Sequence, residues 1–136
     1  MTTEATQGPV VLVVDDTSET RRLMRRVLER DGVGVIEAPS GEVALEMIET
    51  ARPDAVILDL RLPGISGQEV VRRIRAHPTR RIAATPVLAC SASVQPEVRT
   101  DAIEAGCDAF EPKPFDVRAF PGRVRSLILE VAERRG

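Results

Sequence analysis

The sequence has 136 residues, of which 43% are hydrophobic and 29% are charged, as expected for one soluble globular domain with its own core. Its formal net charge of −2 argues against non-specific binding to nucleic acid or to an anionic membrane. No apolar run approaches the ~20 residues that cross a bilayer, and the polar start of the chain has no apolar signal-peptide core. We therefore expect a cytoplasmic protein with no membrane insertion and no direct contact with nucleic acid.

Cysteine and histidine are too few for several kinds of catalytic or metal site. Cys90 and Cys107 are the two cysteines, and in a cytoplasmic chain we expect buried thiols rather than a disulfide. His77 is the one histidine and there is no CxxC pair, so a zinc site or a Ser/His triad would lack its parts.

The first predicted elements are a strand over residues 10–14 and a helix after it. The strand is a valine-rich run that ends at a pair of aspartates. The helix is indicated by an apolar stripe at residues 23, 24, 27 and 28. Around this stripe lie four arginines, which we expect to form a solvated helix face: Arg21, Arg22, Arg25 and Arg26.

The chain then alternates between short apolar runs and amphipathic stretches. The runs predict four further strands, at residues 33–36, 55–58, 86–90 and 109–112. The stretches between and after them predict four further helices, with apolar stripes within residues 44–48, 70–74, 98–103 and 120–131. We expect every stripe to face the core, and we expect Gly106 to end the fourth helix.

This order of five strand–helix pairs predicts an α/β fold. The central runs do not alternate between apolar and polar residues, which is typical of parallel strands buried on both faces. Right-handed crossovers then give a doubly wound five-stranded parallel sheet, with five helices distributed over both faces. We expect one domain over residues 9–136, after a flexible segment at residues 1–8.

The unusual polar residues all fall at the carboxyl ends of predicted strands. They are Asp15, Asp16, Asp59, Ser91 and Lys113. Taken singly, each has a simpler explanation, as a turn cap, a helix N-terminal anion or a loop hydroxyl. In the strand order 2-1-3-4-5, however, ligands bind outside the carboxyl ends of strands one and three. A shared site is therefore the favoured interpretation.

These residue types suit the binding and transfer of a phosphoryl group. Three carboxylates repel one another unless a cation lies among them, and Mg²⁺ prefers such oxygen ligands. Lys113 is the one lysine among nineteen basic residues, and its compact ammonium fits a narrow pocket better than a guanidinium. Ser91 would add a hydroxyl donor. Asp59 is best placed to act as a nucleophile that forms an acyl phosphate.

At this point the chain resembles the receiver domain of two-component response regulators, over about residues 9 to 135. The resemblance rests on five motifs in order: Asp15-Asp16 after Val-Leu-Val-Val, Asp59 in Val-Ile-Leu-Asp-Leu, the loop at residues 63–67, Ser91-Ala92, and Lys113-Pro114-Phe115. It implies the flavodoxin-like form of the doubly wound sheet. It also implies a cytoplasmic signalling protein rather than an enzyme, with self-catalysed phosphorylation and dephosphorylation only.

The resemblance assigns a role to each matching residue. Asp59 would accept a phosphoryl group from a phosphohistidine of a histidine kinase or a histidine phosphotransfer protein, and Lys113 would pair with Asp59. The ligands of Mg²⁺ would be the carboxylates of Asp15, Asp16 and Asp59 with the backbone carbonyl of Arg61.

The resemblance also implies a conformational switch. Ser91 would donate to the phosphoryl group, and Phe110 would turn inward in response. The downstream protein target would bind the face formed by the fourth helix, the fifth strand and the last helix. The first helix, with its four arginines, would be the docking surface for the kinase.

Three residues depart from the commonest family pattern. Phe110 lacks the hydroxyl of a tyrosine, so we hypothesise that its ring lies inward even without phosphate. The side chain of Arg61 at the pocket mouth would alter the lifetime of the phosphate. Pro121 falls early in the last helix, where it either disturbs the hydrogen-bond ladder or shifts the start of the helix.

Several functions stay open from the sequence. The leading one is a single-domain response regulator that acts by protein contact, and a phosphorelay intermediate or phosphate sink is an alternative. A phosphatase with an aspartyl nucleophile is a third, although Arg61 stands where its Asp-x-Asp motif needs a second aspartate. A degenerate receiver that acts only as an interaction module is the fourth, and the intact set of site residues argues against it.

Overall fold

The computed structural model describes residues 8–93 and 95–135, so most of the expected flexible segment 1–8 lies outside the described residues. Five parallel strands form one sheet in the order β2-β1-β3-β4-β5, which confirms the predicted topology. The strands are β1 Val10–Val14, β2 Gly34–Ala38, β3 Ala55–Asp59, β4 Val87–Ser91 and β5 Ala109–Pro112.

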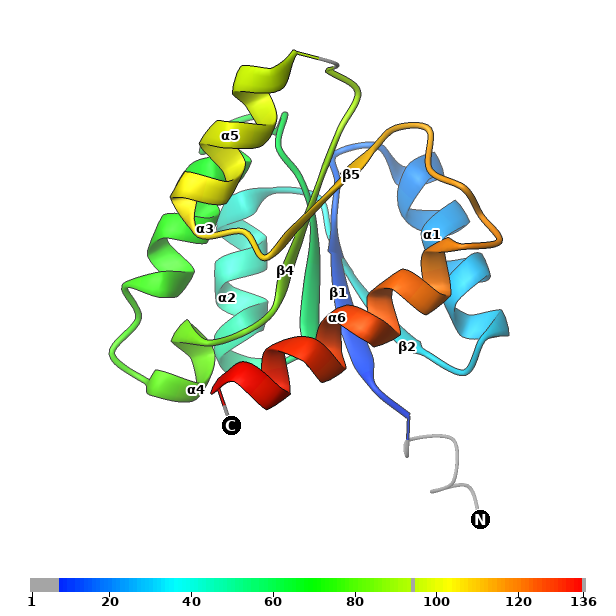
Figure 1. Ribbon diagram of the computed structural model, residues 1–136, viewed down its shortest axis with the longest axis horizontal. Helices are drawn as coiled ribbons and strands as arrows, with labels where there is room; N and C mark the ends of the chain where they lie inside the picture. Colours follow the sequence, from blue (N-terminus) through cyan, green and yellow to red (C-terminus); the bar gives the residue numbers. More distant parts are fainter. Residues whose placement is uncertain (1–7, 94, 136) are drawn as a thin grey trace.

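The helices cover both faces of the sheet, with α1 and α6 on one face and α2, α3 and α5 on the other (Figure 1). They are α1 Ser18–Arg30, α2 Gly41–Ala51, α3 Gly67–Arg75, α4 Arg80–Ala83, α5 Pro96–Ala105 and α6 Phe120–Arg135. The short helix α4 was not predicted, because a single turn is too short to show an apolar period. Within the described part of the chain, no helix is long and apolar enough to cross a membrane.

The core lies in two layers, one on each face of the sheet. On β1, Leu12 and Val14 point into the layer under α2, α3 and α5, whereas Val11 and Val13 point into the layer under α1 and α6. All five residues of β3 are buried. Burial on both faces explains why the central strands read as continuous apolar runs.

Two residues of the predicted apolar stripes do not reach the core. Leu23 on α1 is 40% exposed and Ile103 on α5 is 44% exposed, so the expectation that every stripe residue is buried was wrong for these two. On α1 the inward face is narrower than the stripe, and Met24 and Leu28 fill it.

Local sequence signals set several helix ends. Ser40 and Ser66 cap α2 and α3, because their hydroxyls accept from the backbone N–H three residues later. Gly106 ends α5 as predicted, with φ of 120°. Helix α6 begins at Phe120, so Pro121 lies in its first turn, where a missing N–H costs little. Pro121 is therefore the second residue of the helix, a position that does not interrupt its hydrogen-bond ladder.

Candidate functional site

Three carboxylates meet at the carboxyl ends of β1 and β3. Because β1 and β3 are neighbours in register, with Val14 opposite Leu58, the residues after these positions lie side by side. One ligand oxygen each from Asp15, Asp16 and Asp59 lies within 4.8 Å of the others. Asp15 and Asp59 are buried and Asp16 is exposed, so the cluster opens to solvent on one side.

The single lysine lies against this cluster. Lys113 Nζ is 2.8 Å from Asp15 Oδ2 and 3.1 Å from Asp59 Oδ2. The backbone N–H of Lys113 donates to Ser91 O at 2.9 Å, which fixes the segment after β5 to the end of β4. The Lys113–Pro114 peptide bond is cis. The ion pair with Asp59 was expected, but the shorter one with Asp15 was not, because two adjacent aspartates look equivalent in sequence.

The electrostatics of the pocket keep Lys113 charged. Burial lowers the pKa of Lys113, but the hydrogen bonds to Asp15 and Asp59 outweigh burial, and its pKa lies above the ordinary value. Burial raises the pKa of Asp59, and the N–H of Arg61 and the Lys113 ammonium oppose that rise. The Arg61 N–H donates to Asp59 Oδ1 at 3.0 Å. Each carboxylate oxygen of Asp59 therefore accepts one hydrogen bond, Oδ1 from Arg61 N and Oδ2 from Lys113 Nζ.

The donor set of this cluster fits a magnesium ion. All three side chains offer carboxylate oxygens, which Mg²⁺ prefers, and one of them stays open to water. Three carboxylates against one ammonium leave an excess of negative charge that a divalent cation would balance.

Ser91 ends β4, the strand next to β3 in the sheet, and Phe110 lies on β5, the strand beyond it. Ser91 is buried at the end of β4, and its Oγ accepts from Ser93 N at 3.1 Å. Among the described residues, no hydrogen bond joins that hydroxyl to Asp59. Phe110 is half-buried, packs against the core layer under α5, and lies 5.9 Å from the guanidinium carbon of Arg99. The ring is therefore not well exposed. A well-exposed ring would have contradicted the hypothesis that Phe110 lies inward without phosphate.

The four arginines of α1 divide into two pairs. Arg21 and Arg25 turn inward and bind Glu37 of β2 at 2.9 Å and 2.7 Å. Arg21 also donates to Asp15 O at 2.7 Å, directly behind the carboxylate cluster. Arg22 and Arg26 are exposed. The expected solvated face is thus correct for one pair and wrong for the other, whose charges fasten α1 to β2.

One residue that holds the loop after Asp59 in place was not predicted from the sequence. Glu42 at the start of α2 accepts from Ile65 N at 3.2 Å, within the loop that follows the central aspartate. Gly64 in this loop has φ of 73°, a conformation that favours glycine. Exposed glutamates are common on helices, so the sequence carried no signal for this contact.

The chain matches a known family over most of its length. Residues 11–125 fit the family model of the response regulator receiver domain. The transcriptional regulatory protein ResD of Bacillus subtilis is 35% identical over 130 residues, which are 96% of this chain and 52% of ResD. Response regulator MprA of Mycolicibacterium vanbaalenii is 36% identical over 118 residues, 87% of this chain and 49% of MprA. The chain spans about half the length of the curated relatives it matches.

Solved structures have the same fold. A response regulator receiver domain from Francisella superposes with a TM-score of 0.82 at 27% identity, over 90% of this chain and 98% of that one. The chemotaxis response regulator CheY4 of Vibrio cholerae superposes with a TM-score of 0.81 at 26% identity, over 89% of this chain and 99% of that one. These structures share the topology that brings the carboxylates together.

Proposed function

The chain belongs to the response regulator receiver domain family, and on that premise we propose that Asp59 accepts a phosphoryl group from a phosphohistidine of a histidine kinase or histidine phosphotransfer protein. The observation that carries the proposal is the ion pair of Lys113 with both Asp15 and Asp59 beside the carboxylate cluster. We propose that this switch occupies residues 9–136 and acts through protein contact.

Each residue of the pocket has a separate role in the proposed phosphoryl transfer. The P–N bond of the donor breaks as a bond forms between phosphorus and an Asp59 oxygen, and the imidazole leaves. The Arg61 N–H and Lys113 hold Asp59 in place. Lys113 then neutralises an oxygen of the phosphoryl group, and Ser91 donates a hydrogen bond to another.

A magnesium ion would be held by Asp15, Asp16 and Asp59 with the backbone carbonyl of Arg61. When bound, it supplies positive charge to the phosphoryl oxygens. In its absence the three carboxylates repel the incoming phosphoryl group, and Lys113 alone offsets them.

The response would travel from Ser91 to the face formed by α5, β5 and α6. Ser91 Oγ accepts from Ser93 N, so its own proton is free to donate to a phosphoryl oxygen; a move of the hydroxyl toward that oxygen would draw Ser93 and the segment before α5 with it. Phe110 on β5 packs into the same layer of core as α5. A shift of this segment therefore changes the surface offered to a downstream protein.

The kinase or phosphotransfer protein would dock on α1. Arg22 and Arg26 are the exposed members of the arginine run, because Arg21 and Arg25 are engaged with Glu37. The proposed docking contribution therefore belongs to Arg22 and Arg26.

Incubation with acetyl phosphate and Mg²⁺, followed by intact-mass measurement, tests the phosphoacceptor directly. Wild type is expected to gain one phosphoryl group, and Asp59→Asn none. Asp101→Asn, which removes an exposed carboxylate on α5, is the matched control and should be phosphorylated like wild type.

Other outcomes point to the competing functions. No incorporation into wild type would favour a degenerate receiver that only binds partners. Rapid turnover of a small phosphate ester, lost in Asp59→Asn, would favour a phosphatase. A phosphoryl group that passes on to a second histidine protein would favour a phosphorelay intermediate.

A further inference from the structure

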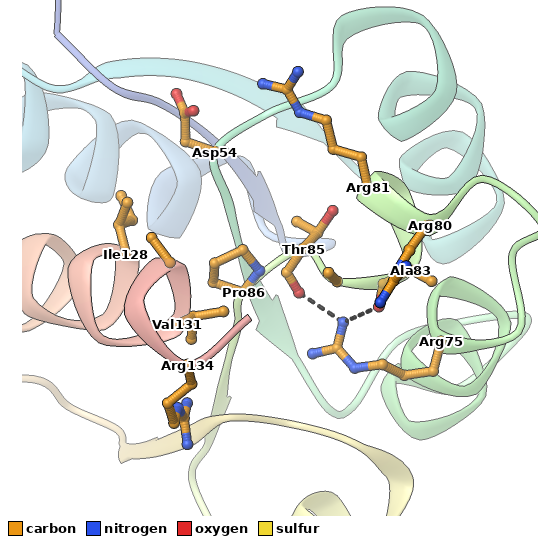
Figure 2. Close-up of a pocket in the computed structure, with 12 residues that line it drawn as sticks. Asp54, Arg75, Arg80, Arg81, Ala83, Thr85, Pro86, Ile128, Val131 and Arg134 are labelled. Carbon is orange, nitrogen blue, oxygen red and sulfur yellow. Dashed lines mark hydrogen bonds between the residues drawn. The ribbon is translucent and has the colours of Figure 1, made fainter. Parts of the chain in front are cut away.

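A pocket of about 980 Å³ lies at the amino ends of β3 and β4, whereas Asp59 lies at the carboxyl end of β3. Thr85 and Pro86, which lead into β4, form its floor, and Asp54, which precedes β3, lies at its rim (Figure 2). Helix α6 forms one wall and the short helix α4 forms the other. The proposed phosphorylation does not use this pocket.

The wall from α6 is apolar. Ile128, Val131 and Ala132 line it, and Pro86 continues this surface across the floor. Ala132 is exposed and Ile128 is half-buried, so apolar surface remains open to a ligand. A depression at the upper end of the ~300–1,000 Å³ range of small-molecule sites has room for a flat organic group against its wall.

The remaining surface of the pocket is rich in guanidinium groups. Arg80 and Arg81 come from α4 and Arg134 comes from α6, and Figure 2 shows Arg81 and Arg134 on opposite sides of Pro86. Within the residues that the structure describes, neither Arg80 nor Arg81 has a carboxylate in ion-pair contact. Both are exposed, so their charge is available to a ligand.

A fourth arginine, Arg75, stabilises the wall of the pocket formed by α4 and the residues after it. The Arg75 guanidinium donates to Ala83 O at 2.8 Å and to Thr85 O at 2.7 Å, and it binds Asp108 Oδ2 at 2.8 Å. These bonds fix the connection between α4 and β4. Arg75 therefore fixes the shape of the pocket wall. Arg134 also lies 3.7 Å from Asp108 Oδ1, at the weak end of an ion pair, whereas Arg80 and Arg81 remain for a ligand.

We propose that this pocket binds a nucleoside phosphate. The guanidinium groups of Arg80, Arg81 and Arg134 would hold the phosphates, because the planar fork of arginine matches phosphate oxygens. The apolar wall of α6 would cover one face of the base. Asp54, the one carboxylate among the lining residues, accepts from Val10 N through Oδ2 at 2.8 Å, and its other oxygen would accept from a ribose hydroxyl.

Three features favour this class over a simple anion or an acidic peptide. Arg75 and Arg134 are in ion pairs with Asp108, but Arg80 and Arg81 add two positive charges against the single lining carboxylate of Asp54, so the pocket favours an anion. Inorganic phosphate has no apolar surface, so it would make no favourable contact with the apolar wall of α6. The pocket is also walled by helices on two sides, which suits a compact molecule better than an extended peptide.

Calorimetric titration without Mg²⁺ and with a chelator present tests the proposal, because these conditions keep ligands from bridging to the carboxylate cluster. The probes are adenosine diphosphate, pyrophosphate and adenosine. We expect the diphosphate to bind at least tenfold more tightly than either of the other two. Equal binding of diphosphate and pyrophosphate, or no binding of the diphosphate, overturns the proposal.

Variants locate the site. The double variant Arg80→Gln/Arg81→Gln should weaken binding of the diphosphate at least tenfold, whereas Arg118→Gln, which removes an exposed arginine outside the pocket, should leave it unchanged. Ala132→Glu places a carboxylate on the exposed part of the apolar wall and should abolish binding even if the double variant fails to fold. Unchanged binding in Ala132→Glu overturns the proposal, as does equal weakening in Arg118→Gln. Tighter binding of a polyglutamate peptide than of the diphosphate would overturn it in favour of an acidic protein partner.

Discussion

Lys113 is held by two carboxylates that come from different strands. Its Nζ lies 2.8 Å from Asp15 Oδ2 and 3.1 Å from Asp59 Oδ2, so it occupies a narrow gap between them. A chain that uses arginine at eighteen of its nineteen basic positions keeps lysine here. The geometry supplies the reason, because an ammonium is compact and a guanidinium is a wide planar fork.

Lys113→Arg tests this shape argument. We expect phosphorylation by acetyl phosphate to slow by at least about tenfold, because the larger head group cannot contact Asp15 and Asp59 without displacing one of them. The measurement is the initial rate of phosphoryl incorporation followed by mass spectrometry. Arg22→Lys, the reverse change on an exposed residue, should have no effect. A normal rate in Lys113→Arg would show that charge alone is required.

The position of the site residues could be predicted from the sequence, but the direction of their side chains could not. Asp15, Asp16, Asp59 and Lys113 each follow a strand, and parallel topology alone brings strand ends together. The choice of Asp15 rather than Asp16 as the second partner of Lys113 depends on which way two adjacent side chains point. No periodicity in the sequence encodes that direction.

Among the elements, α3 is placed by the close approach of a glycine. A Cβ at Gly67 would lie 2.7 Å from Leu60 Cα and 2.8 Å from Asp59 O, both of which are backbone atoms. The start of α3 therefore packs directly against the residue proposed to accept the phosphoryl group, and only glycine permits this distance.

Gly67→Ala should lower the free energy of unfolding by about 1–3 kcal/mol, because backbone atoms must shift to admit the methyl group. Gly122→Ala is the matched control, since no atom lies within 4 Å of a Cβ at that position of α6. The control should be neutral or stabilising by up to about 1 kcal/mol. Urea unfolding followed by circular dichroism measures both. Equal stability of the two variants would contradict the packing argument.

Helix α1 is fastened to β2 by Glu37, and this contact depends on pH. The hydrogen bond from Arg25, with a second from Arg21, lowers the pKa of Glu37 below its ordinary value. A carboxyl with a depressed pKa in the folded state stabilises the fold above its unfolded pKa. That contribution is lost as the pH falls through the folded pKa.

Glu37→Gln should therefore cost about 0.5–1 kcal/mol of unfolding free energy at neutral pH, in the range of partly exposed ion pairs. The difference from wild type should shrink as the pH falls through the depressed folded-state pKa of Glu37 and vanish only below it, where the carboxyl is protonated in both states. Denaturant melts at several pH values measure it. Glu46→Gln on the exposed face of α2 should show no such dependence. A cost that persists in acid would show that the ion pairs are not its cause.

The elements themselves were predictable where they are long and periodic. Five strands and five helices follow from their apolar runs and stripes, whereas the single turn of α4 carries no period. The stripe of α1 also suggested that Leu23 is buried, because the pattern does not show how much of a helix its neighbours cover.

For the molecule as a whole, the two thiols report on global unfolding. Cys90 and Cys107 are buried in opposite core layers, and burial raises the pKa of each to about 12. A thiol with such a pKa forms almost no thiolate at neutral pH.

Labelling by a thiol reagent should therefore be slow in native buffer and should follow the fraction of unfolded protein as urea rises. Both cysteines should react together, because each becomes accessible only when its layer of core opens. Mass spectrometry of partly labelled samples distinguishes singly from doubly labelled chains. Fast labelling of either cysteine without denaturant would contradict this expectation.

The contact between Asp15 and Lys113 joins residues that are 98 positions apart. During synthesis, the acidic half of the pocket is complete once β3 has emerged, but its ammonium arrives only with the residues after β5. If Asp59 is the phosphoacceptor, the ammonium that balances its pocket is therefore present only once the residues after β5 have been made and have reached the end of β4.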